Sequence, residues 1–205
     1  GLPLKKEVKI STVVEAHDVE PILRKALGKK RSEVDLVHFT QFLGGYYGDA
    51  TIAMTPKNRT ELIEKIGIPK EKVFLVPSGV DNEISYTGIN TQENILVYLG
   101  NIFYPPNLET VTFLIEKVLP DVRKQIPKTC LKIIGAAPKE LQKKYSNKKE
   151  VEFVGELRDR KLLSQELKSS TLGLATVFVA SGMKIKILDY SVNGLPIITT
   201  PIVAE

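Results

Sequence analysis

Five short apolar runs in the second half of the chain constrain its fold more than any other feature. Each run is almost continuous rather than alternating with polar residues, which is typical of strands covered on both faces of a parallel sheet. A helix or turn signal follows each of them. The runs are Ile95–Leu99, Leu131–Ile134, Val151–Val154, Leu172–Val177 and Pro196–Thr199. Strands that alternate with helices in this way predict a doubly wound α/β domain.

Two helices between these runs are predicted from their apolar spacing. A stripe from Leu108 to Val122 predicts an amphipathic helix that begins after a cap at Asn107. Leu162, Leu163 and Leu167 predict another helix after Asp159.

The first half of the chain repeats the pattern less completely. Its predicted elements are strands at Thr12–Val14, Ala50–Met54 and Val73–Val76, a helix at Asn58–Ile66 and a loop at Gly44-Gly45. Three strands with their helices make only part of a sheet. A polar stretch then predicts a linker. The predicted organisation is therefore a partial first lobe over 1–82, a linker over 83–93 and a Rossmann-like second lobe over 94–205.

Three of the predicted strands end in glycine, at Gly100, Gly135 and Gly155. Ligands of doubly wound sheets bind at the carboxyl ends of the strands, and glycine lets a ligand approach the backbone closely. A tight turn would also explain each glycine taken singly. The three together favour a ligand crevice at this edge.

The segment from Ser181 to Asp189 predicts a helix that opens at Gly182 and would present unpaired N–H groups to a phosphate. Gly182, Lys186, Asp189 and Asn193 would share one face. A cation near the helix start and a carboxylate further along suit a nucleoside diphosphate. The alternative is an exposed Lys186–Asp189 ion pair with no ligand.

Composition excludes several classes of function. A net charge of +5 is mild, and no basic stripe carries interleaved aromatic residues, so nucleic acid is not an expected partner. The single cysteine, Cys130, excludes an internal disulfide and is expected in the core. Two histidines without ligand spacing argue against a protein-held metal.

No signal peptide is expected from the charged start, and the longest apolar run, Leu172–Ala180, is too short to cross a bilayer. The sequence therefore predicts a cytoplasmic, soluble protein, with membrane association left open.

These motifs together resemble the retaining GT-B glycosyltransferases, specifically glycosyltransferase family 4. Ser181–Asp189 with Asn193–Thr200 resembles the family's donor-binding helix and the strand after it. Phe74–Asp81 resembles the hinge that ends the first lobe. Gly100–Asn107 resembles the first loop of the second lobe, and Phe153–Leu157 resembles the nucleotide-base loop. The resemblance runs from His17 to Thr200.

The resemblance implies roles for particular residues. It implies that Asp189 binds the ribose diol and that the Gly182 end of the helix, with Lys186, holds the diphosphate. It implies that His17 faces the transferred sugar as the catalytic residue, although a turn histidine explains His17 equally well. The remaining residues implied in donor binding are Gly100, Asn101, Gly135, Gly155, Glu156, Leu157 and Ser181.

The chain departs from the family pattern in several places. Ser181 stands where many relatives have glutamate, and Asp189 is shorter than the usual glutamate. Asn101–Pro106 lacks the arginine and lysine that commonly serve the phosphates. The early first-lobe strands and the closing helices are not represented, so the chain resembles a fragment.

The implied function is metal-independent transfer, with retention, of a hexose from a nucleotide diphosphate sugar. The acceptor would be a glycan, lipid or small molecule, in cell-envelope or glycan biosynthesis, and no cofactor is implied. The 205-residue chain alone is expected to bind nucleotide but to transfer sugar poorly. The alternatives are a sugar-nucleotide epimerase of the same architecture and a non-catalytic nucleotide-binding module. A dinucleotide dehydrogenase is disfavoured because G-x-G-x-x-G is missing after Ile95–Leu99.

Overall fold

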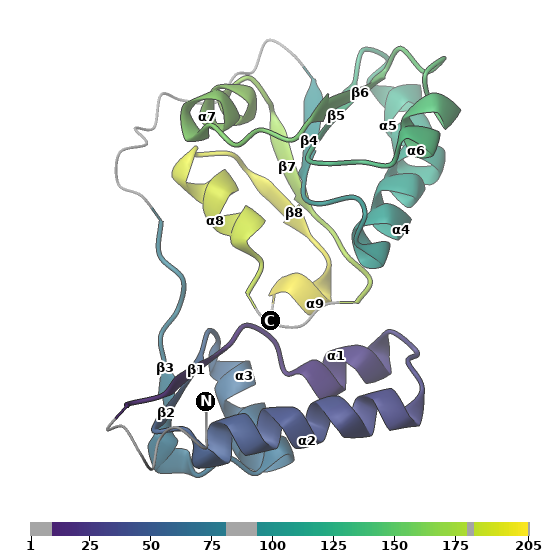
Figure 1. Ribbon diagram of the computed structural model, residues 1–205. Coiled ribbons are helices and arrows are strands. Elements are labelled where there is room, and N and C mark those ends of the chain that lie inside the picture. The colour runs from purple at the N-terminus through teal and green to yellow at the C-terminus, as the bar shows by residue number, and fades with distance from the viewer. Residues whose placement is uncertain (1–9, 81–93, 180–182, 205) are drawn as a thin grey trace. The chain divides into compact units, whose positions relative to one another are not determined.

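The computed structural model describes residues 10–80, 94–179 and 183–204 (Figure 1). The chain divides into two compact units, one of Gly1–Ser78 with Val179–Met183 and one of Gly79–Phe178 with Lys184–Glu205. Each unit is built around its own parallel sheet. The predicted linker at 83–93 lies outside the described residues.

The first unit contains a three-stranded parallel sheet in the order β1-β2-β3. Its strands are β1 (Val13–Ala16), β2 (Ala50–Ala53) and β3 (Val73–Leu75). Its helices are α1 (Glu20–Ala26), α2 (Arg31–Tyr47) and α3 (Pro56–Glu61), with a π-helical turn η2 (Leu62–Ile66) and a 3-10 turn η3 (Lys70–Lys72). The three predicted strands are confirmed to within two residues at either end.

The predicted loop at Gly44-Gly45 is wrong, because both glycines lie within α2. Gly45 is buried, and a Cβ added there would overlap the side chain of Ile68. The glycine therefore allows close packing of the helix rather than a turn.

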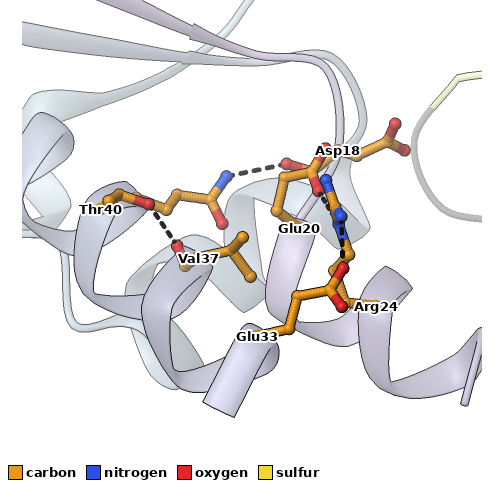
Figure 2. Close-up of polar contacts among 7 residues, drawn as sticks. Asp18, Glu20, Arg24, Glu33, Val37 and Thr40 are labelled. Carbon is orange, nitrogen blue, oxygen red and sulfur yellow. Dashed lines mark hydrogen bonds and ion pairs between the residues drawn. The ribbon is translucent and has the colours of Figure 1, made fainter. Parts of the chain in front are cut away.

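Polar side chains join α1 to α2 (Figure 2). The Arg24 guanidinium contacts two carboxylates, with Nε 3.0 Å from Glu20 Oε2 and Nη1 2.8 Å from Glu33 Oε1. The amide nitrogen of Gln41 donates to the carbonyl of Asp18, just before α1. These contacts fix the segment that follows β1.

The second unit contains five parallel strands in the order β6-β5-β4-β7-β8. They are β4 (Ile95–Leu99), β5 (Cys130–Ile134), β6 (Val151–Gly155), β7 (Leu172–Ala175) and β8 (Ile197–Thr199). The chain moves outward from β4 to β6 and then returns to the other side of β4. This reversal makes the doubly wound topology of the Rossmann type, with its switch point between β4 and β7.

Helices cover both faces of this sheet (Figure 1). They are α4 (Pro105–Phe113), η4 (Leu114–Val118), α5 (Leu119–Gln125), α6 (Lys139–Lys144), α7 (Arg160–Lys168), α8 (Ile185–Val192) and α9 (Pro201–Ala204). A hydrophobic cluster packs on each face of the sheet, and adjacent residues of a strand belong to different clusters. Tyr98 and Ile133 belong to one cluster, and Val97 and Ile134 belong to the other. Burial on both faces explains the near-continuous apolar runs, and the predicted α/β, GT-B-like fold class is confirmed.

Two local predictions in this unit need correction. The helix predicted after an Asn107 cap begins at Pro105, with Tyr104 as its N-cap, because two prolines occupy its first turn. Cys130 is half-buried rather than in the core. The helix predicted after Asp159 is confirmed, and the Asp159 carboxylate accepts from the N–H groups of Lys161 and Leu162.

Candidate functional site

A cavity of about 260 Å³ opens at the carboxyl ends of β4, β5 and β6. It is lined by Leu99, Gly100, Asn101, Ile134, Gly135, Ala136, Glu156 and Leu157. Five of these residues are ones that the family resemblance implies in donor binding. The structure therefore brings Gly100, Asn101, Gly135, Glu156 and Leu157 together around one space.

Close backbone contact shapes the floor of this cavity. Gly100 N–H donates to the carbonyl of Ile134, and Gly135 N–H donates to the carbonyl of Gly155. Gly135 has φ +135°, and a Cβ at this position would overlap the carbonyl oxygen of Gly100. Gly155 also has a positive φ, +89°, but open space beside it. Only glycine fits at position 135 without moving the neighbouring strand end.

The loop after β4 is held by a short hydrogen-bond network. Tyr98 Oη donates to Asn107 Oδ1 at 2.7 Å, and Asn107 Nδ2 donates to the carbonyl of Asn101 at 2.8 Å. The Asn101 side chain accepts from Phe103 N–H. Asn107 therefore holds the loop after β4 from a position within α4. The sequence predicted it only as the cap of that helix and part of a loop.

Lys186 ends beside this loop, in a position unusual for an amine. Its Nζ lies 3.9 Å from the centre of the Tyr98 ring, and a Cβ on Gly100 would lie 3.3 Å from it. The nitrogen is buried and has no hydrogen-bond partner among the described residues. Burial lowers the pKa of Lys186 to about 7, with a smaller contribution from the charge of Lys184.

Tyr190 places Lys186 at this point. Its ring is fully buried, and its hydroxyl accepts from Leu99 N–H at 2.8 Å. Gly173 on β7 leaves room for the ring, since a Cβ there would lie 2.7 Å from it. Because Lys186 is one helical turn before Tyr190, it lies against Gly100 at the switch point of the sheet.

The helix predicted to open at Gly182 begins later than expected. Helix α8 begins at Ile185, because Lys184 has an extended backbone (φ −94°, ψ 92°) that cannot continue the helical hydrogen bonds. Gly182 and Ser181 lie outside the described residues. The predicted glycine opening is therefore wrong for α8, and any role of those two residues stays a prediction.

The predicted polar stripe on α8 is divided among three different environments. Asp189 Oδ1 accepts from Arg160 Nη1 of α7 at 2.8 Å, with side-chain exposures of 14% and 60%. Asn193 is buried and bonds Ser164 Oγ and the carbonyl of Asp189. The alternative Lys186–Asp189 ion pair is also wrong, since Asp189 pairs with Arg160 instead.

Glu156 stands after β6, at the opposite side of the cavity from the loop that Lys186 contacts. Its Oε2 is 3.2 Å from Arg158 Nη2, and the two side chains are 54% and 85% exposed. Both ends of this ion pair are open to water, so it contributes little to stability.

His17 belongs to the first unit and directly follows β1. Its Nε2 lies 3.5 Å from Glu15 Oε1, and its side chain is 67% exposed. Its carbonyl accepts from Asn58 Nδ2. The imidazole is therefore accessible, and its catalytic role stays a prediction.

Sequence reasoning missed four residues that shape this region, namely Tyr98, Tyr190, Arg160 and Ser164, and it predicted Asn107 only as a helix cap and part of a loop. Arg160 and Ser164 are four residues apart, as are Asp189 and Asn193. This equal spacing was the signal in the sequence that α7 and α8 pack side by side. No cluster of three or more His, Cys, Asp or Glu side chains suited to a metal occurs within residues 10–80, 94–179 and 183–204. None of the helices in those ranges is long and apolar enough to span a bilayer.

The sheet order and the cavity at its carboxyl edge define a Rossmann-like lobe of the GT-B type. The chain belongs to the group 1 glycosyl transferases, whose family model matches residues 93–205, more than half of the chain. A comparison with curated protein sequences gives no match.

Solved structures with this fold include HepE of Anabaena, in complex with UDP and glucose, at 14% identity and a TM-score of 0.73. Sucrose-phosphate synthase from Thermosynechococcus elongatus has 15% sequence identity to this chain and a TM-score of 0.75. WaaG, a glycosyltransferase involved in lipopolysaccharide biosynthesis, has 18% sequence identity to this chain and a TM-score of 0.70. These similarities cover 97%, 97% and 98% of this chain but only 55%, 52% and 64% of those chains. The chain thus spans between about half and two thirds of the length of these three structures.

Proposed function

We propose that the protein transfers a sugar from a nucleoside diphosphate sugar to an acceptor and that its second unit binds the donor. The observation that carries this proposal is the buried amine of Lys186, which has no hydrogen-bond partner in the described part of the chain and lies beside a cavity at the carboxyl edge of the sheet. A buried amine without a hydrogen-bond partner is costly, and an anionic ligand would supply the missing hydrogen bonds. Membership of the group 1 family gives the reaction class.

Each part of the donor has a proposed site on this chain. Lys186 would bind the diphosphate and stabilise the charge that develops as the sugar bond breaks. A charge-assisted hydrogen bond of this kind contributes about 1.5–3 kcal/mol. Asp189, now paired with Arg160, would bind the ribose, and the backbone from Gly155 to Leu157 would face the base. Gly182 and Ser181 keep their proposed place at the phosphates, and His17 its proposed place at the sugar.

The finer parts of the proposal rest on the likeness to family 4 enzymes. They are retention of the anomeric configuration, a hexosyl donor and a reaction that requires no metal. The proposed acceptor is a glycan, a lipid or a small molecule, in a cytoplasmic reaction. A lipid acceptor would also bring the protein to a membrane surface. Because the chain covers about half of the related structures, we expect it to bind nucleotide and to transfer little sugar.

A thermal-shift experiment tests the donor site. UDP, GDP and ADP are added separately to the wild-type chain and to Lys186→Met, with Lys143→Met as the matched control on α6. At 100 times the dissociation constant, a bound nucleotide adds about 2.7 kcal/mol to stability. The wild type and Lys143→Met are expected to shift with at least one nucleotide, and Lys186→Met much less. A folded wild type that shifts with none of the three contradicts the proposal.

A further inference from the structure

The cavity in the second unit has two chemically different sides. Gly100 and Asn101 follow β4, and Gly100 lies next to the amine of Lys186. Glu156 and Leu157, after β6, bring a carboxylate and an apolar side chain. Strands β4 and β6 are both neighbours of β5, so these two sides are separated by two strand spacings, about 10 Å.

This separation of charge orients a nucleoside diphosphate. Its phosphates are attracted to Lys186 and repelled by the Glu156 carboxylate. The base is therefore directed toward Glu156, where Leu157 offers apolar contact to its ring. The carboxylate then meets the hydrogen-bonding edge of the base.

A carboxylate accepts hydrogen bonds and donates none, so it distinguishes the bases. Guanine presents two adjacent donors, N1–H and N2–H, which match the two carboxylate oxygens in a bidentate pair. Uracil presents one N–H between two carbonyl oxygens, which a carboxylate repels. Adenine and cytosine each place a ring-nitrogen acceptor beside their single amino group.

We propose that Glu156 makes this cavity selective for guanine, so that the donor is a guanosine diphosphate sugar. The inference rests on the proposed function, because it assumes that the cavity holds a nucleotide. The carboxylate of Glu156 forms its ion pair with the exposed Arg158, at 3.2 Å. An ion pair so open to water is readily exchanged for a bidentate contact with the base.

Isothermal titration calorimetry with four nucleotides tests this inference. GDP, IDP, UDP and ADP are titrated into the 205-residue chain. IDP is included because its base, hypoxanthine, is guanine without the N2 amino group. GDP is expected to bind at least tenfold more tightly than UDP or ADP, with IDP in between. A good bidentate contact to a base gives discrimination of this order.

The variant Glu156→Gln is expected to lose at least tenfold in GDP affinity and to bind UDP at least as tightly as the wild type, because its amide no longer repels the uracil carbonyls. The matched control is Glu152→Gln, an exposed glutamate on β6 outside the cavity, which should bind all four nucleotides like the wild type. Thermal unfolding of each variant checks that it is folded.

The outcomes separate the two proposals. If the folded wild type binds none of the nucleotides, both the donor site and the guanine inference are wrong. If nucleotides bind but UDP or ADP matches GDP, the guanine inference alone is overturned. The guanine inference is also overturned if Glu156→Gln keeps the full preference for GDP.

Discussion

Lys186 is the residue on which the proposed donor site depends, and its titration gives a prediction about stability. Its pKa is about 7 in the folded chain and near 10.4 in an unfolded one. Between these values the unfolded state holds the extra proton, so the free energy of unfolding rises with pH. The contribution is at most about 1.4 kcal/mol per pH unit.

Urea unfolding at pH 7, 8 and 9 measures this contribution. The wild type is expected to gain stability from pH 7 to 9 relative to Lys186→Met, while Lys143→Met follows the wild type. Equal pH dependence in the wild type and Lys186→Met would mean that the amine is exposed to water in the folded chain.

Alanine substitutions at Gly135 and Gly155 allow the cost of steric overlap to be measured apart from the cost of backbone strain. Gly135→Ala meets both a positive φ and the carbonyl of Gly100, whereas Gly155→Ala meets only the positive φ. We expect Gly155→Ala to cost about 1–2 kcal/mol and Gly135→Ala clearly more. Chemical denaturation measures both, with Gly79→Ala as the control because nothing lies near its added Cβ. Equal losses at 135 and 155 would show that the loops at Gly100 and Gly135 are not in contact.

Helices α7 and α8 are joined by two side-chain contacts at matching intervals of four residues. Arg160 pairs with Asp189 at the exposed end, and Ser164 bonds the buried Asn193 one turn further on. Asn193→Ala leaves the buried Ser164 hydroxyl without its partner, which costs about 1–3 kcal/mol. Arg160→Met removes a half-exposed contact and should cost less than about 1 kcal/mol.

A double-mutant cycle over Ser164→Ala and Asn193→Ala isolates the buried contact. A coupling energy above about 0.5 kcal/mol is expected for residues in direct contact. Additive losses would indicate that the two side chains do not bond each other.

At the scale of elements, the sequence predicted strands better than helix ends. The strands could be predicted because both faces of the sheet are buried, which makes each strand a nearly continuous apolar run. The start of α8 depends on the backbone of Lys184, and the start of α4 on two prolines whose effect outweighed an Asn107 cap. The loop prediction at Gly44-Gly45 failed because the contact of Gly45 with Ile68 is invisible without the fold.

For the chain as a whole, alternation of strands and helices was enough to predict the α/β class. The strand order, and hence the switch point beside Gly100, follows only from pairing between distant segments. Two of the three strand-end glycines, Gly100 and Gly135, line the cavity, whereas Gly155 does not. The partners of Asp189 and Asn193 were missed because they come from another helix, which a single helical face does not reveal.

Proton uptake on nucleotide binding tests whether Lys186 holds the diphosphate. GDP and UDP are titrated at pH 8, where the terminal phosphate is fully ionised, in buffers of different ionisation enthalpy. Lys186 is mostly neutral at this pH and would be protonated beside the diphosphate. We expect uptake of close to one proton by the wild type and Lys143→Met, whereas Lys186→Met should bind at least tenfold more weakly and take up no proton. Tight binding without proton uptake, or uptake that persists in Lys186→Met, would contradict this expectation.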